Sequence, residues 1–141
     1  DFGFPRCHGA AVVDPEFGTQ GACEQAVPPV QELGAHVAPL GVKFYTGTAF
    51  PEQYRGQLLI AEHGSWNRSE KSGYRLTRVT LDGDRAVAYE PFVFGFHEGD
   101  EVFGRPVDLL VLKDGSLLVS DDHVGAIYRI TYRAPQQVGT E

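Results

Sequence analysis

The stretch from Glu62 to Arg68 contains most of the kinds of polar side chain that a binding or catalytic site uses. Within seven residues it holds an acid, an imidazole, a hydroxyl, an indole, an amide and a guanidinium. Gly64 gives the backbone the freedom to turn there. A single histidine or tryptophan at such a place more often packs at the edge of the core. This combination of polar side chains on one loop, however, indicates a binding or catalytic site. The residues in question are Glu62, His63, Ser65, Trp66, Asn67 and Arg68.

A short buried strand is predicted to deliver this loop. Leu58, Leu59 and Ile60 form an apolar run, and a run of this length beside turn residues favours a strand over a helix. Other strands are predicted from β-branched and aromatic content and from the turn signals between them. They cover Val42–Tyr45, Tyr74–Leu81, Ala86–Phe96, Pro106–Leu112, Ser116–Ser120 and Ala126–Tyr132, and one helical turn is expected over Pro51–Tyr54.

The predicted strands repeat along the chain. At a shift of fifty-nine residues, the segment from Leu58 to His63 matches the segment from Leu117 to Asp122, and each is followed by a polar loop and another strand. Such a repeat of short antiparallel strands is typical of β-propeller blades of four strands each. We therefore predict an all-β chain with about two blades and an incomplete ring, which leaves an open apolar face for blades supplied by a longer parent chain or a companion chain.

These observations predict a simple organisation. Residues 1–34 form a loop-rich N-terminal segment, residues 35–100 a complete blade, and residues 101–133 the last blade with three strands. The tail from 134 to 141 has no apolar run and is expected to fray. Because the sequence begins with aspartate rather than methionine, we expect a processed product or a part of a longer chain.

Composition and charge exclude several classes of function. The formal net charge is −7 and no basic block is present, which argues against binding to nucleic acid. No apolar segment approaches the roughly 20 residues needed to span a bilayer. Seventeen glycines and nine prolines indicate many turns, in agreement with an all-β chain.

Cys7 and Cys23 are the only cysteines, and the segment between them contains Pro15, Gly18 and Gly21, which is typical of a loop. We expect a disulfide, which would remove loop-closure entropy worth about 3 kcal/mol. The alternative is a metal site, which the pattern favours less because neither C-x-x-C nor C-x-x-C-H occurs. A disulfide predicts an oxidising compartment, so the expected location is periplasmic or secreted.

Several motifs together resemble the C-terminal part of the glucose/sorbosone dehydrogenases. They are Phe2-Gly3-Phe4-Pro5, the segment 35–41, Phe44-Tyr45-Thr46-Gly47, the segment 61–68, Phe103-Gly104-Arg105-Pro106 and the segment 114–122. The resemblance extends to Tyr132 and is nearest to the L-sorbosone dehydrogenase branch. It implies a six-bladed propeller that binds pyrroloquinoline quinone (PQQ) and Ca²⁺, and that oxidises a sugar by hydride transfer to the quinone.

The resemblance also assigns candidate residues. Arg105 matches a basic residue that contacts the cofactor, whose three carboxylates suit guanidinium. His63 or Arg68 is expected to supply a second basic contact, Trp66 to stack on a quinone or sugar, and His36 to lie on a loop at the same end. The catalytic base and most Ca²⁺ and PQQ ligands precede this chain in the family, so we expect no catalytic residue here and no activity from the chain alone.

Simpler interpretations stand beside these assignments. Arg105 would otherwise pair with Asp108 or Glu101, and His36 would fix its loop. Asp121 and Asp122 offer two carboxylates for Ca²⁺, but an aspartate after a strand more often caps a turn. His8, His97 and His123 belong to no constellation and are expected to be exposed.

Two other classes of function remain open. A cofactor-free propeller would bind a sugar or a protein through the same loops, because fold does not determine function. A propeller lactonase would need metal ligands at the axis, which here could begin only with Glu62 and Asn67. The type of sugar and the electron acceptor are not indicated by these residues.

Overall fold

The computed structural model of the chain describes residues 1–134, so nearly all of the tail expected to fray lies outside the described residues. In the described part, regular structure consists of β-strands and one turn of 3-10 helix, η1 (Glu52–Tyr54), without an α-helix. The strands form four antiparallel sheets, and no closed barrel is present among residues 1–134. The all-β class predicted from the sequence is confirmed, as is the helical turn after Pro51. Nowhere in residues 1–134 is there a helix with the length and apolarity that a membrane span requires.

The largest sheet has four strands in the order of the sequence. They are β3 (Pro39–Phe44), β4 (Leu58–Glu62), β5 (Arg75–Asp82) and β6 (Arg85–Val93). Each pairs with the next in antiparallel register, for example Leu59 with Arg78 and Arg78 with Glu90. The hairpin between β5 and β6 turns at Gly83, as the Asp-Gly signal predicts.

A three-stranded sheet follows, made of β9 (Pro106–Val111), β10 (Leu117–Asp121) and β11 (Ala126–Ile130). In the sequence, a small hairpin of β7 (His97–Glu98) and β8 (Glu101–Val102) connects the two sheets. The sequence analysis did not predict this hairpin. The predicted strand from Ala86 to Phe96 therefore stops early, at Val93, and the backbone changes direction at Gly95, whose φ is 101°.

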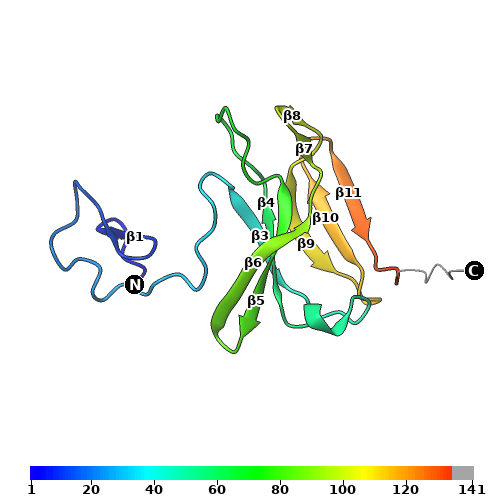
Figure 1. The fold of residues 1–141 in the computed structure, drawn as a ribbon, viewed down its shortest axis with the longest axis horizontal. Coiled ribbons are helices and arrows are strands. Elements are labelled where there is room, and N and C mark those ends of the chain that lie inside the picture. The colour runs from blue at the N-terminus through cyan, green and yellow to red at the C-terminus, as the bar shows by residue number, and fades with distance from the viewer. Residues whose placement is uncertain (135–141) are drawn as a thin grey trace, which may run out of the picture.

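The two larger sheets pack against each other, as Figure 1 shows. Alternate residues of each strand face inward, which is the two-residue period of a strand. Tyr45 joins the sheets at the end opposite the polar loops, because its hydroxyl donates to the carbonyl oxygen of Gly115 at 2.7 Å. The buried core consists of Tyr45, Phe50, Leu59, Ala61, Leu76, Leu109, Leu117 and Val119.

The outer faces of both sheets carry exposed apolar side chains. Val42 and Phe44 of β3 are about half exposed, and so is Leu110 of β9, while Ile127 of β11 is 71% exposed. An open groove of about 650 Å³ lies over the outer face of the four-stranded sheet, between its apolar side chains and residues 30–33. The open apolar face expected from the sequence is thus present on both sheets.

The N-terminal segment packs mainly on itself and lies to one side of the sheets (Figure 1). Its only sheet pairs β1 (Cys7–His8) with β2 (Val12–Val13). Cys7 and Cys23 are joined by a disulfide. Asp14 closes the turn that follows β2, because its carboxylate accepts hydrogen bonds from the backbone N–H of Glu16 and Phe17 and contacts His8. His8 therefore has a polar partner, although the sequence suggested none.

Candidate functional site

Four polar loops meet at one end of the two sheets because the strands alternate in direction. His36 precedes β3 and His63 follows β4, while Arg105 precedes β9 and Asp122 follows β10. In an antiparallel sheet, the start of one strand and the end of its neighbour lie at the same edge. We call this edge the loop end, and it contains His36, His63, Arg105 and Asp122.

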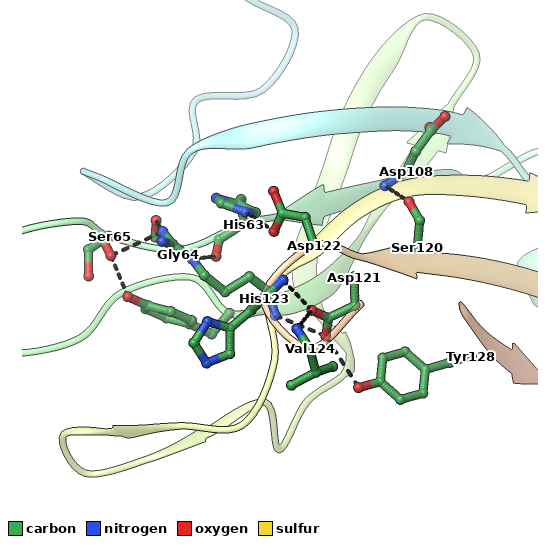
Figure 2. A network of polar contacts seen from close by, with 12 residues as sticks. His63, Gly64, Ser65, Asp108, Ser120, Asp121, Asp122, His123, Val124 and Tyr128 are labelled. Carbon is green, nitrogen blue, oxygen red and sulfur yellow. Dashed lines mark hydrogen bonds and ion pairs between the residues drawn. The ribbon is translucent and has the colours of Figure 1, made fainter. Parts of the chain in front are cut away.

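His63 and Asp122 are in direct contact across the two sheets. Nε2 of His63 lies 2.8 Å from Oδ1 of Asp122, and Figure 2 shows the two side chains facing each other. His63 is mostly shielded, with 18% of its side chain exposed, whereas Asp122 is 62% exposed. The hydrogen bond from His63 lowers the pKa of Asp122 below its usual value; desolvation opposes this effect, and the charge of Arg105 adds to it. The sequence suggested both residues but did not predict that they form a pair.

Arg105 holds the backbone that follows β4. Its Nε donates to the carbonyl oxygen of His63 at 3.1 Å, and its Nη2 donates to that of Gly64 at 2.7 Å. The guanidinium lies 5.3 Å from the centre of the Tyr74 ring, within the range of a cation–π contact. Arg105 forms no salt bridge within residues 1–134. The predicted alternative, an ion pair with Asp108 or Glu101, is therefore not formed there.

The base of the loop between β4 and β5 is closely packed. Gly64 donates its N–H to the carbonyl oxygen of Val37 at 2.8 Å, and the Tyr74 hydroxyl donates to the carbonyl oxygen of Ser65. Gly64 has a φ of 100°, and a Cβ there would lie 2.5 Å from the Tyr74 ring. Only glycine fits both the backbone conformation and the space, so the turn expected at Gly64 is a requirement of this packing.

The remaining predicted residues do not join the pair of His63 and Asp122. Trp66 is 87% exposed on the outer part of the β4–β5 loop. Arg68 lies on the same loop, where its Nε donates to the carbonyl oxygen of Glu70 at 3.0 Å. His36 is exposed and has a φ of 62°, in the left-handed region. Of the five predicted residues, the structure thus brings His63 and Arg105 together and leaves the other three on exposed loops.

Asp121 is buried and caps the loop after β10. One carboxylate oxygen accepts hydrogen bonds from the N–H of His123 at 2.9 Å and of Val124 (Figure 2). The other accepts one from the N–H of Arg105. The Tyr128 hydroxyl contacts the same carboxylate at 3.3 Å. This arrangement agrees with the turn-capping interpretation. Within residues 1–134, no group of three histidine, cysteine or acidic residues is placed to hold a metal ion.

Glu62 is the centre of a second polar cluster, which sequence reasoning missed. Its side chain is fully buried, and its carboxylate accepts hydrogen bonds from Arg75 and Thr77, both at 2.9 Å, and from the Tyr89 hydroxyl. Burial and the hydrogen bond with Glu62 raise the pKa of Tyr89. The signal in the sequence was Arg75 and Thr77, two residues apart on the strand that pairs with β4. Because its carboxylate already accepts hydrogen bonds from three side chains, Glu62 is not available as a metal ligand of a lactonase site with Asn67.

Comparisons with known proteins agree with this architecture. An uncharacterized protein of Borreliella burgdorferi is 44% identical over 135 residues, a match that covers 93% of this chain and 36% of the relative. The holo form of the pyranose dehydrogenase PQQ domain from Coprinopsis cinerea is 26% identical with a TM-score of 0.67, over 92% of this chain and 40% of that one.

A calcium structure of Trichoderma reesei Carbohydrate-Active Enzymes Family AA12 is 22% identical with a TM-score of 0.69, over 91% of this chain and 37% of that one, which shows likeness of fold. The chain thus spans well under half the length of each of these relatives. A family model described as TrAA12-like matches residues 8–133. Since that match includes both larger sheets and all four polar loops, the chain belongs to the TrAA12-like family.

Proposed function

We propose that this chain is the C-terminal part of a PQQ-dependent sugar dehydrogenase, of the L-sorbosone dehydrogenase type, and that it contributes two of six propeller blades. The TrAA12-like match and the likeness to a solved PQQ domain support this proposal. The apolar outer faces of the two larger sheets support the presence of neighbouring blades, because uncovered patches of this kind mark surfaces that pack against other parts of a protein.

One observation carries the proposal: Arg105 places a positive charge at the loop end and forms no salt bridge within residues 1–134, although its charge also helps to lower the pKa of the exposed Asp122. The guanidinium is partly buried, and its hydrogen bonds go to neutral carbonyl groups. A shielded charge of this kind favours a bound anion. PQQ carries three carboxylates, so the residues at the loop end fit such a group.

The residues of this chain bind and orient rather than catalyse. PQQ, when bound, supplies the quinone that accepts a hydride from the sugar. Arg105 provides charge for a carboxylate, and Asp122 holds the imidazole of His63 in a fixed orientation beside it. The catalytic base and most Ca²⁺ ligands belong to the other blades, and the electron acceptor is not specified by this chain.

The disulfide supports a periplasmic or secreted location for the proposed enzyme, since such bonds persist in oxidising compartments. The alternative function is a cofactor-free propeller that binds a sugar or a protein. The observation that favours it is the exposure of Trp66, which needs no cofactor to bind a ligand.

The experiment that tests the proposal is a titration of the full-length protein with PQQ in the presence of Ca²⁺, followed by absorbance. Arg105→Gln keeps an N–H donor near the loop carbonyls but removes the charge, and we expect it to weaken PQQ binding at least about tenfold, or about 1.4 kcal/mol. The matched control is Arg129→Gln, whose guanidinium pairs with Asp114 at the opposite end of the sheet. Absence of PQQ binding by the wild-type protein would contradict the dehydrogenase proposal. The cofactor-free propeller that binds a sugar or a protein would then be the remaining candidate.

A further inference from the structure

Aspartate precedes glycine at two places in the chain, Asp82-Gly83 and Asp114-Gly115. In such a dipeptide the backbone nitrogen of the glycine is able to attack the side-chain carboxyl of the aspartate, because glycine has no Cβ to obstruct the approach. Both dipeptides lie in turns, the first between β5 and β6 and the second between β9 and β10. The local sequence therefore treats them alike, and the tertiary structure separates them.

The two carboxylates differ in their partners. That of Asp114 accepts hydrogen bonds from the N–H of Ser116 at 3.0 Å and from its hydroxyl at 2.6 Å, and it pairs with Arg129. Within residues 1–134, the carboxylate of Asp82 accepts no hydrogen bond, and its ion pair is with Arg85 at 3.8 Å. Both side chains of that pair are almost fully exposed, so the pair restrains Asp82 little.

The two glycine nitrogens differ in the same way. Gly115 donates its N–H to the carbonyl oxygen of Leu112 at 2.9 Å, and a Cβ on Gly115 would lie 2.6 Å from the backbone nitrogen of Ala49. The N–H of Gly83 makes no hydrogen bond within residues 1–134, and a Cβ there would meet no atom within 4 Å. Figure 1 shows the β5–β6 hairpin at the end of the sheet opposite the polar loops. The peptide unit after Asp82 thus has a free nitrogen and room to move.

We propose that Asp82 is a site of spontaneous isomerisation to isoaspartate. The nitrogen of Gly83 forms a bond to the side-chain carboxyl carbon of Asp82, and the carboxyl hydroxyl leaves as water with the proton of that N–H. Water then opens the five-membered ring at the former main-chain carbonyl carbon. Gly83 remains joined to the side-chain carbonyl of residue 82, and the α-carboxylate becomes free. The mass is unchanged, and the reaction requires water and no other reactant.

The modification acts on the end of one hairpin. It adds a methylene to the main chain between residues 82 and 83, next to the last paired position of the hairpin, where Asp82 faces Arg85. The register of this turn is lost, because the turn geometry fixes it. Leu76 and Val79 of the same strand are buried farther along β5, so the core between the sheets is retained. The inference does not depend on the proposed function.

The test is to age the full-length protein at neutral pH in heavy-oxygen water, both folded and unfolded in guanidinium chloride. Mass spectrometry of the digested protein then measures isoaspartate and heavy oxygen at positions 82 and 114. In the folded protein we expect at least about tenfold more isoaspartate at 82 than at 114, because reaction at 114 must first break the hydrogen bonds of Asp114 and Gly115. In guanidinium chloride the two positions should react at similar rates.

Asp82→Glu is the control variant, because it keeps the charge but would have to close a larger, less favourable ring. Position 82 of this variant should remain unmodified, while position 114 behaves as in the wild type. Equal amounts of isoaspartate at 82 and 114 in the folded protein would overturn the inference. Absence of isoaspartate at 82 in the folded protein would overturn it as well, and its appearance in guanidinium chloride would then show that the folded hairpin is held rigid or covered.

Discussion

His63 and Asp122 occupy equivalent positions in the two repeats, fifty-nine residues apart, and their side chains meet at 2.8 Å. The residues just before them are equivalent as well: Glu62 and Asp121 are both buried strand-end carboxylates, and both contact a tyrosine hydroxyl. Each repeat therefore ends its second strand with a buried acid that is satisfied within its own sheet. The next residue of each repeat, His63 or Asp122, contributes to a polar link between the sheets.

The link between His63 and Asp122 predicts a pH-dependent contribution to stability. Because the folded pKa of Asp122 lies below its usual value, the interaction stabilises the fold above the unfolded pKa and is lost as the pH falls through the folded pKa. Asp122→Asn should therefore lower the free energy of unfolding at pH 7. The difference from the wild type should shrink below about pH 4. Urea unfolding of the full-length protein over this pH range provides the measurement.

The control for this experiment is Asp82→Asn. Asp82 and Arg85 form a pair at 3.8 Å in which both side chains are almost fully exposed, and such pairs contribute little. A pH-independent difference between Asp122→Asn and the wild type would show that the charge of Asp122 is not responsible.

Removal of the buried carboxylate of Glu62 should be strongly destabilising. Glu62→Ala leaves Arg75 and the hydroxyls of Thr77 and Tyr89 without their acceptor, and breaking a buried ion pair in this way costs about 3–5 kcal/mol. Urea denaturation at pH 7 measures the loss. Glu90→Gln is the comparison, because Glu90, which pairs with Arg78, is 46% exposed to solvent and should contribute less than about 1 kcal/mol. Equal effects of the two substitutions would contradict the structural role of Glu62.

The contact between the sheets depends on a few large side chains. Leu59 is 1% exposed and belongs to the core shared with Leu109 and Leu117, so Leu59→Ala should lower the free energy of unfolding by about 2–5 kcal/mol. Val87→Ala, on the outer strand β6, removes a half-exposed side chain and should change stability by less than about 0.5 kcal/mol. A cost below 1 kcal/mol for Leu59→Ala would mean that the two sheets do not pack as described.

The disulfide should stabilise only the N-terminal segment. Replacement of both Cys7 and Cys23 by alanine restores loop-closure entropy of about 3 kcal/mol to the unfolded segment, and β1 and β2 have few other contacts to hold them. Hydrogen exchange should show faster exchange in residues 1–34 and unchanged protection in β4 and β5. Loss of protection in those two strands would instead show that the segment supports the sheets.

The sequence alone determined the local structure of this protein. Runs such as Leu58–Ile60, the Asp-Gly turn before β6 and the alternation in β5 predicted strands that the structure confirms, because period, propensity and turn chemistry are local properties. The repeat of fifty-nine residues also indicated two similar sheets. The resemblance to the glucose/sorbosone dehydrogenases predicted the same kind of fold, in agreement with the TrAA12-like match. The resemblance also implied that His63 and Arg105 lie in loops at the same end.

Only the tertiary structure decided which side chains meet. Whether Arg105 would face Asp108, Glu101 or the loop after β4 depends on how the two sheets pack, and the structure directs it to the carbonyls of residues 63–65. Glu62 looked like a member of the polar loop, but as the last residue of β4 it points between Arg75 and Tyr89 and is buried. Pairing across strands joins residues that are distant in sequence, and spacing along the chain alone does not determine which of them meet.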